Sequence, residues 1–263
     1  MTLDVVIATY SPDGIIRVSD MNLPVVEGVK YIVNWQKHEG AEIPAKLLRD
    51  DIKVYRTSGE GSSVNRNEGI MHANSEIVYL ADDDIQIMPE AFDTIIGRFE
   101  EFPDTQLATF MMKETARKKY PLEVTELNFY LPKGYSVATY QMAFRREIFP
   151  QISFNEKFGI NSGVFEAGED ELFHLTARKH RIKCRFFPDI IASHPHEATG
   201  RRKINDKKIL HGMGAVITLS YPKSFFLRIP LRAWRLHKAK RCRFFRALKH
   251  LFVGSWKSKC VDV

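Results

Sequence analysis

Short runs of apolar, β-branched residues recur along the first half of the chain, and this recurrence constrains the fold more than any other feature. The runs lie at residues 3–9, 29–33, 52–56, 76–81 and 107–112. Each has the length and composition of a strand buried on both faces of a sheet. A sheet of this kind must be covered by helices, because both of its faces are apolar.

Segments of helical character separate these strands or follow them. Apolar residues at helical spacing occur at residues 62–74 and 89–101, and an acidic-headed helix is predicted at 168–180. A late strand follows at 185–193. Strands that alternate with helices predict a doubly wound α/β domain, which we place at residues 1–215.

Charge divides the chain into two unequal parts. Residues 221–263 hold twelve Lys or Arg and one acidic residue, a net charge of +11, whereas the rest carries −4. A basic helical extension is therefore predicted over residues 216–263, with an anionic surface as its partner. Within it, residues 241–256 form an amphipathic helix with interleaved arginines. Its apolar stripe consists of Phe244, Phe245, Leu248, Leu251, Phe252 and Trp256.

Two partners suit this stripe. Aromatic residues combined with arginines are typical of a helix at a membrane interface, so we expect a membrane surface rather than nucleic acid. Packing of the stripe onto the main domain is the alternative.

The N-terminus has no signal-peptide pattern, and the apolar run at 209–222 is shorter than the roughly 20 residues that span a bilayer. The three widely spaced cysteines match no disulfide framework. We expect a cytoplasmic protein, peripheral on the inner face of the membrane.

Three consecutive carboxylates, Asp82, Asp83 and Asp84, directly follow the strand at 76–81. Ligands of open α/β sheets bind at the carboxyl ends of strands. Adjacent carboxylates repel one another unless a positive charge lies among them, and a hard divalent cation such as Mg²⁺ or Mn²⁺ is a natural partner. Such a cation can bridge the phosphates of a nucleotide.

The triplet belongs to an ordered set of motifs. The set comprises LDVVIATY at residues 3–10, VNRNEGI at 64–70 and IVYLADDDIQIMP at 77–89. Together these segments resemble the family 2 glycosyltransferases of the GT-A fold, in which Asp82-x-Asp84 matches the D-x-D motif. The resemblance implies a Rossmann-like mixed sheet flanked by helices. It also implies an inverting glycosyltransferase that moves a sugar from a nucleotide-diphosphate sugar to a hydroxyl acceptor, in bacterial cell-surface polysaccharide or glycan biosynthesis.

The resemblance also assigns the donor side of the site. It implies that Asp84 ligates the metal and that Asp82 contacts the metal shell or the sugar nucleotide. The family's base-reading Asp-Asp-Gly-Ser stretch is absent, and Asn34-Trp35-Gln36 stands after the second strand instead. A UDP-sugar is the expected donor, with a glycan or lipid-linked acceptor. The residues expected to bind the nucleotide sugar are Thr9, Tyr10, Asn34, Arg66, Asp82 and Asp83.

A second acidic motif supplies the catalytic group. Residues 167–173, AGEDELF, resemble the family's E-D motif, in which the Asp acts as general base. An acceptor hydroxyl is a poor nucleophile until its proton is removed. The resemblance therefore makes Asp170 the base, with Glu169 orienting the acceptor. The alternative is an acidic first turn that only stabilises a helix.

A histidine completes the predicted metal site. His194 follows the strand at 185–193, where GT-A enzymes often place a metal-ligating histidine, and His196 is the second candidate. An imidazole ligand favours Mn²⁺ over Mg²⁺. The basic block at 200–203 is either a solvated loop or a lid over the diphosphate.

Two other functions fit parts of the sequence. A metal-dependent nucleotidyltransferase or phosphohydrolase would also use clustered carboxylates, but it predicts a glycine-rich loop where residues 8–15 hold only Gly14. A non-enzymatic membrane- or nucleic-acid-binding module predicts basic clusters throughout, whereas the body of the chain is net acidic.

Overall fold

The computed structural model describes residues 1–113, 120–127, 132, 135–149, 151–194, 204 and 206–262. The chain divides into two compact units. The sheet unit consists of residues 1–60, 64–153 and 177–196, and the helical unit consists of residues 61–63, 154–176 and 197–263.

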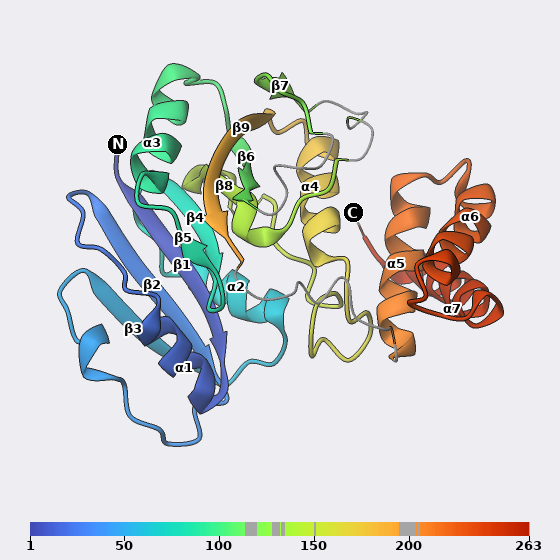
Figure 1. Ribbon diagram of the computed structural model, residues 1–263, viewed down its shortest axis with the longest axis horizontal. Coiled ribbons are helices and arrows are strands. Elements are labelled where there is room, and N and C mark those ends of the chain that lie inside the picture. The colour runs from blue at the N-terminus through green and yellow to red at the C-terminus, as the bar shows by residue number, and fades with distance from the viewer. Residues whose placement is uncertain are drawn as a thin grey trace. The chain divides into compact units, whose positions relative to one another are not determined.

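The sheet unit is built on a mixed β-sheet (Figure 1). Strands β3, β2, β1 and β4 are parallel, β8 runs antiparallel to both of its neighbours, and β9 is parallel to β6. In sheet order the strands are β3 (Ile52–Thr57), β2 (Val29–Gln36), β1 (Leu3–Tyr10), β4 (Ile77–Asp82), β8 (Met142–Arg145), β6 (Leu107–Met112), β9 (Cys184–Ser193) and β5 (Gln86–Ile87), and β7 (Thr125–Glu126) pairs with β9.

The apolar runs form the strands because their side chains are buried on both faces. Nearly every residue of β1, β4 and β6 is buried, and one hydrophobic cluster joins the sheet to α1 (Ser11–Asp20) and α3 (Ala91–Glu101). Each large apolar side chain removed from water contributes about 1.5–3 kcal/mol. Helix α2 (Ser62–Met71) connects β3 to β4. The predicted α/β fold with a mixed sheet and flanking helices is confirmed.

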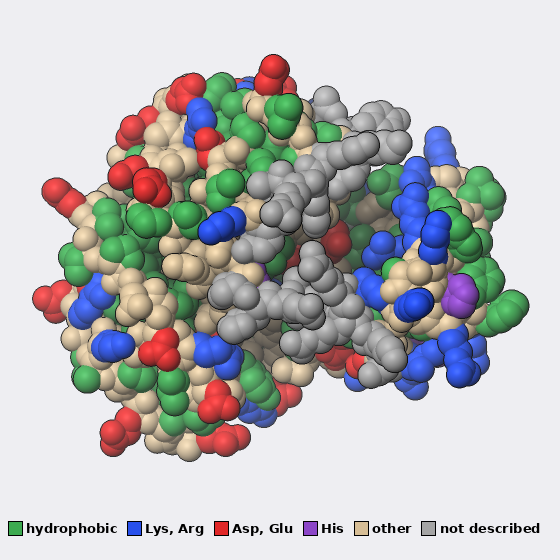
Figure 2. Space-filling view, in the orientation of Figure 1, with side chains coloured by type: hydrophobic (Ala, Val, Ile, Leu, Met, Phe, Trp, Pro, Cys, Tyr) green, Lys and Arg blue, Asp and Glu red, His purple; other side chains and the backbone are tan. Residues whose placement is uncertain are grey.

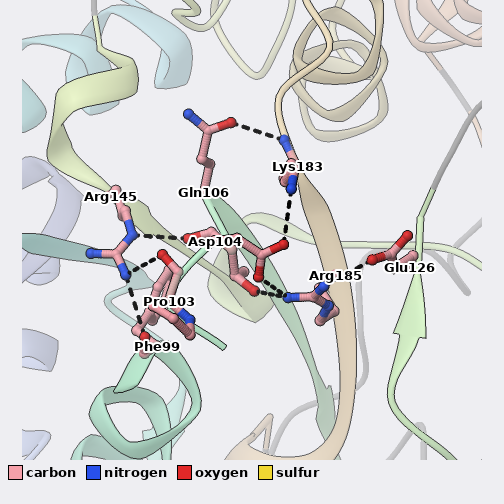
Figure 3. Close-up of polar contacts among 9 residues, drawn as sticks. Phe99, Pro103, Asp104, Gln106, Glu126, Arg145, Lys183 and Arg185 are labelled. Carbon is pink, nitrogen blue, oxygen red and sulfur yellow. Dashed lines mark hydrogen bonds and ion pairs between the residues drawn. The ribbon is translucent and has the colours of Figure 1, made fainter. Parts of the chain in front are cut away.

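Strand β9 is anchored at its beginning by a charged cluster (Figure 3). The Arg185 guanidinium lies 2.9 Å from a carboxylate oxygen of Asp104 and 2.9 Å from one of Glu126, and Lys183 lies 3.0 Å from Asp104. These cations hold the pKa of the Asp104 carboxyl well below its usual range. The cluster joins the beginning of β9 to the residues before β6 and to β7, and the far end of β9 precedes His194.

The helical unit contains α5 (Lys207–Ser220), α6 (Phe225–Lys238) and α7 (Phe244–Lys257), together with the start of α4 (Glu169–Lys179). Helices α5 and α7 pack with their backbones close together. A Cβ on Gly214 would lie 2.0 Å from the carbonyl oxygen of Leu251, and one on Gly254 would lie 2.0 Å from that of His211. Only glycine fits at these two crossing points, since real Cβ contacts are never so short.

The C-terminal helices expose large apolar side chains among Lys and Arg (Figure 2). The predicted stripe of α7 divides in two, because Leu251 is buried whereas Phe245, Phe252 and Trp256 are exposed. Helix α6 exposes Phe226, Leu227, Leu231 and Trp234. Within the described part of the chain, no helix has the length and hydropathy to cross a membrane.

Some elements were not expected from the sequence. Helix α1 begins at Ser11, whose φ of 68° and following proline resemble a loop. Helices α5 and α6 lie in segments for which the sequence predicts only an apolar run and a basic extension. The predicted domain boundary at residue 215 falls inside α5. The basic block at 200–203 lies outside the described residues.

Candidate active site

The acidic triplet lies at the carboxyl ends of the parallel strands. Asp82 ends β4 and pairs in register with Ala8 of β1, which in turn pairs with Asn34 of β2. Residues at the ends of three neighbouring strands are thus brought to one edge of the sheet, as the sequence predicts. Each carboxylate of the triplet meets a different basic side chain.

Asp82 faces Arg66 of α2. The guanidinium donates a hydrogen bond of 2.8 Å to one carboxylate oxygen, and the Arg66 side chain is only 9% exposed. Helix α2 therefore delivers its arginine to the end of β4. The predicted proximity of these two donor-site residues is present in the structure, and their contact with a nucleotide remains a prediction.

Asp83 is held on the other side, by β1 and α1. Arg17 donates through Nε (3.1 Å) and Nη2 (2.9 Å), and the Thr9 hydroxyl donates at 2.5 Å. Burial raises the pKa of the Asp83 carboxyl, while Arg17 and Thr9 oppose that rise. A Cβ on Gly14 would lie 2.3 Å from Thr9 Oγ1, so glycine is required for this close approach.

These contacts give Asp83 a bracing function that sequence reasoning missed. Arg17 lies 66 positions from Asp83 in the chain, and nothing in its local pattern signals the pairing. Thr9 and Asp83 stay predicted nucleotide-sugar residues, but the contacts seen join them to each other. Through these hydrogen bonds, Asp83 connects the acidic loop to β1 and α1.

Asp84 faces the predicted histidine. His194 Nε2 lies 3.3 Å from Asp84 Oδ2, because β5 pairs with β9 and brings the end of β9 beside the acidic loop. The Asp84 side chain is 41% exposed and that of His194 is 12% exposed. A carboxylate oxygen and an imidazole nitrogen this close together are suitable donors for a divalent cation.

The complete predicted metal set is not assembled. Among the described residues, no group of three or more His, Cys, Asp or Glu side chains is placed to hold a metal ion. One oxygen of Asp82 is already paired with Arg66, which leaves Asp84 and His194 as the fitting pair. The second candidate histidine, His196, lies outside the described residues.

Two further predicted donor residues differ in accessibility. Tyr10 is 41% exposed at the end of β1. Asn34 is fully buried, and its amide donates to Asn65 and to Glu68 Oε2 of α2. Asn34 therefore holds α2 against the sheet. Its side chain could contact a nucleotide base only if it became exposed.

The second acidic motif begins α4 in the helical unit. Glu169 and Asp170 occupy its first turn, where the backbone N–H groups favour negative charge. A Cβ on Gly159 would lie 2.3 Å from Ser62 Oγ and 3.3 Å from the Glu169 carboxyl carbon. Glycine at this position thus allows the Ser62 hydroxyl to lie close to the backbone beside the motif's first carboxylate.

Known proteins resemble this chain in both sequence and fold. The family model described as glycosyl transferase family 2 matches residues 37–166. The structure of S. aureus TarS residues 1–349 aligns at 15% identity with a TM-score of 0.59, covering 98% of this chain and 91% of that one. The same protein in complex with UDP-GlcNAc gives a TM-score of 0.56 at 15% identity, covering 98% and 89%.

A longer S. aureus TarS structure matches with a TM-score of 0.60 at 15% identity. The alignment covers 98% of this chain but 55% of that one. No curated protein sequence matches the chain. At such low identity the structural likeness demonstrates a shared fold.

Proposed function

We propose, from the match of residues 37–166 to the family model described as glycosyl transferase family 2, that the chain is a member of that family and transfers a sugar, with inversion, from a nucleotide-diphosphate sugar to an acceptor hydroxyl. The observation that carries the proposal is the end of β4, where Asp84 faces His194 at 3.3 Å while its two neighbours each hold an arginine. The family match favours this reaction over nucleotidyl transfer, phosphate hydrolysis or a purely binding function.

The proposed donor is a UDP-sugar. Support comes from the S. aureus TarS structures, which share the fold and were determined with UDP-GlcNAc and with UDP. In this chain Tyr10 is exposed at the end of β1, and Arg66 supplies positive charge beside Asp82. An arginine suits phosphate recognition because its planar fork can donate two hydrogen bonds at once.

A divalent cation is the proposed cofactor. Asp84 and His194 would hold it, with the second oxygen of Asp82 as a further ligand. The imidazole favours Mn²⁺ over Mg²⁺. When bound, the cation would neutralise charge on the departing nucleoside diphosphate.

Asp170 is the proposed general base. It would take the proton of the acceptor hydroxyl as that oxygen bonds to the anomeric carbon and the bond from this carbon to the diphosphate oxygen breaks. Glu169, in the same first turn of α4, would orient the acceptor. Attack from the face opposite the leaving group inverts the anomeric configuration.

The proposed acceptor is a glycan or a lipid-linked precursor in bacterial cell-surface biosynthesis. Support comes from the helical unit, where α6 and α7 expose aromatic side chains such as Trp234 and Phe245 among basic residues. Such a surface suits docking on an anionic membrane. We place the enzyme on the cytoplasmic face of the membrane as a peripheral protein.

A panel of nucleotide sugars tests the reaction class. The thermal unfolding midpoint would be measured with UDP-GlcNAc, UDP-glucose, UDP-galactose and GDP-mannose, each with Mn²⁺, Mg²⁺ or EDTA. A ligand at 100 times its Kd stabilises the native state by about 2.7 kcal/mol. We expect a UDP-sugar with Mn²⁺ to give the largest rise. The absence of a rise with every donor and either metal would overturn the proposal.

A further inference from the structure

The helical unit contains a pocket of about 410 Å³ between the loop at residues 157–165 and the end of α7. Its volume lies within the roughly 300–1,000 Å³ typical of small-molecule sites. The wall is mainly apolar. The lining residues are Lys157, Val164, Phe165, Trp256, Lys257, Lys259, Cys260 and Val261.

The charged side chains around this pocket are all positive. Lys157 Nζ donates a hydrogen bond of 3.0 Å to the carbonyl oxygen of Cys260, while Lys257 and Lys259 are exposed. No acidic side chain occurs among the described residues that line it. An apolar interior with an ammonium rim matches a molecule that joins a hydrocarbon chain to an anionic head.

The pocket is continuous with the exposed aromatic stripe of α7. Trp256 lines the pocket and is 70% exposed, and Phe252 and Phe245 lie four and eleven positions earlier on the same face. The same stripe is the surface for which membrane docking is proposed. A lipid in the outermost layer of a docked membrane is therefore close to the mouth of the pocket.

We propose that this pocket binds a single anionic phospholipid. One acyl chain enters between Val164, Phe165 and Val261, and the phosphate lies against Lys257 and Lys259. The inference rests on the proposed membrane docking but adds a defined site to it. Docking by exposed aromatic residues needs only a surface, whereas a pocket predicts saturable, one-to-one binding without a bilayer.

Short-chain lipids below their micelle concentration test the site. In a Trp234→Phe background, Trp256 is the exposed tryptophan, because Trp35 is fully buried. We expect dihexanoyl phosphatidylglycerol to shift the Trp256 emission saturably, at a concentration at least fivefold lower than dihexanoyl phosphatidylcholine requires. Lys257→Gln and Lys259→Gln should each weaken binding by about fivefold, the contribution of one basic residue near an anionic lipid.

Two variants separate the pocket from the docking surface. Val164→Glu, at a position 39% exposed, places a carboxylate at the pocket and should abolish saturable binding. Phe245→Ser changes a side chain that is 81% exposed and outside the lining. It should leave short-chain binding intact while weakening attachment to phosphatidylglycerol vesicles.

The outcomes are distinct. Equal binding of both lipids, or binding unaffected by Val164→Glu and by the two lysine variants, overturns the site. Tighter binding of farnesyl phosphate than of phosphatidylglycerol also overturns it, in favour of an isoprenoid acceptor. Saturable phosphatidylglycerol binding without vesicle attachment supports the site and contradicts only the proposed docking.

Discussion

The two acidic groups of this chain differ in their surroundings. At the end of β4, three consecutive carboxylates face three different basic side chains from three other elements. At the start of α4, Glu169, Asp170 and Glu171 lie in a helical first turn, where the backbone N–H groups favour negative charge. The pairs of the first group are Asp82 with Arg66, Asp83 with Arg17 and Asp84 with His194.

This difference separates the chemistry expected of each group. Three carboxylates gathered at the end of one strand, with the guanidinium groups of Arg66 and Arg17 beside two of them, form a site suited to a metal and a diphosphate. Asp170, in the first turn of α4, is the proposed base, and removal of the acceptor proton belongs to the chemical step rather than to donor binding. The strand group is therefore expected to control donor binding, and the helix group to control turnover.

Asp84→Ala should have the largest effect. It removes the more exposed side chain of the Asp84–His194 pair, so the proposed cation would lose a ligand. Transition-state stabilisation by a metal is worth several kcal/mol, so we expect transfer to fall roughly 10⁴-fold. Isothermal titration with Mn²⁺ and UDP-sugar should show that metal-dependent donor binding is lost. Unchanged binding would remove the central claim about the strand group.

Asp170→Asn should reduce kcat without affecting the donor. General-base catalysis contributes about 10²–10⁴-fold, and the amide cannot accept the proton. The Kd for UDP-sugar should stay within about twofold, because an isosteric amide keeps the shape of the side chain. Initial rates and donor titrations on one preparation provide the measurement. Retained turnover would assign the base to another residue, with Glu169→Gln as the next variant to measure.

The strand group was predictable because its signals are local. A buried apolar run must end at the edge of the sheet, so the position of Asp82 follows from the residues directly before it. The order of motifs along the chain then predicts Arg66 and His194 as site residues. Their contacts with Asp82 and Asp84 agree with that order.

The remaining features depend on tertiary contacts that the sequence does not display. Arg17 reaches Asp83 only because α1 packs beside β1, and α1 itself begins at a residue with positive φ. The glycine contacts between α5 and α7 require two segments about forty residues apart to approach closely. Amphipathic spacing on α7 likewise predicts an apolar face but not which of its residues are buried. Leu251 is buried, whereas Phe245 on the same helix is exposed.

Asp83→Ala tests whether the middle carboxylate acts as a brace. The substitution leaves the buried Thr9 hydroxyl and the Arg17 guanidinium without their acceptor. Loss of such hydrogen bonds costs about 1–3 kcal/mol, so the free energy of unfolding in urea should fall by that amount. A double-mutant cycle with Arg17→Met isolates the pair. Additive changes in stability would show that the two side chains do not stabilise each other.

The smallest effect concerns a buried base in the helical unit, in contrast to the paired charges of the sheet unit. His211 Nε2 lies 3.3 Å from His250 Nδ1, and burial, with the charge of Lys257, lowers the pKa of His211 to about 4 from its ordinary 6.5. Below pH 6.5 the histidine is protonated in the unfolded chain, whereas His211 in the folded protein stays neutral down to about pH 4. The free energy of unfolding therefore falls progressively from pH 6.5 towards pH 4 and changes little above 6.5. We expect a loss of about 1 kcal/mol between pH 7 and 5. Urea unfolding of His211→Gln should show a smaller loss over this interval, and an equal loss would assign the acid sensitivity to other groups.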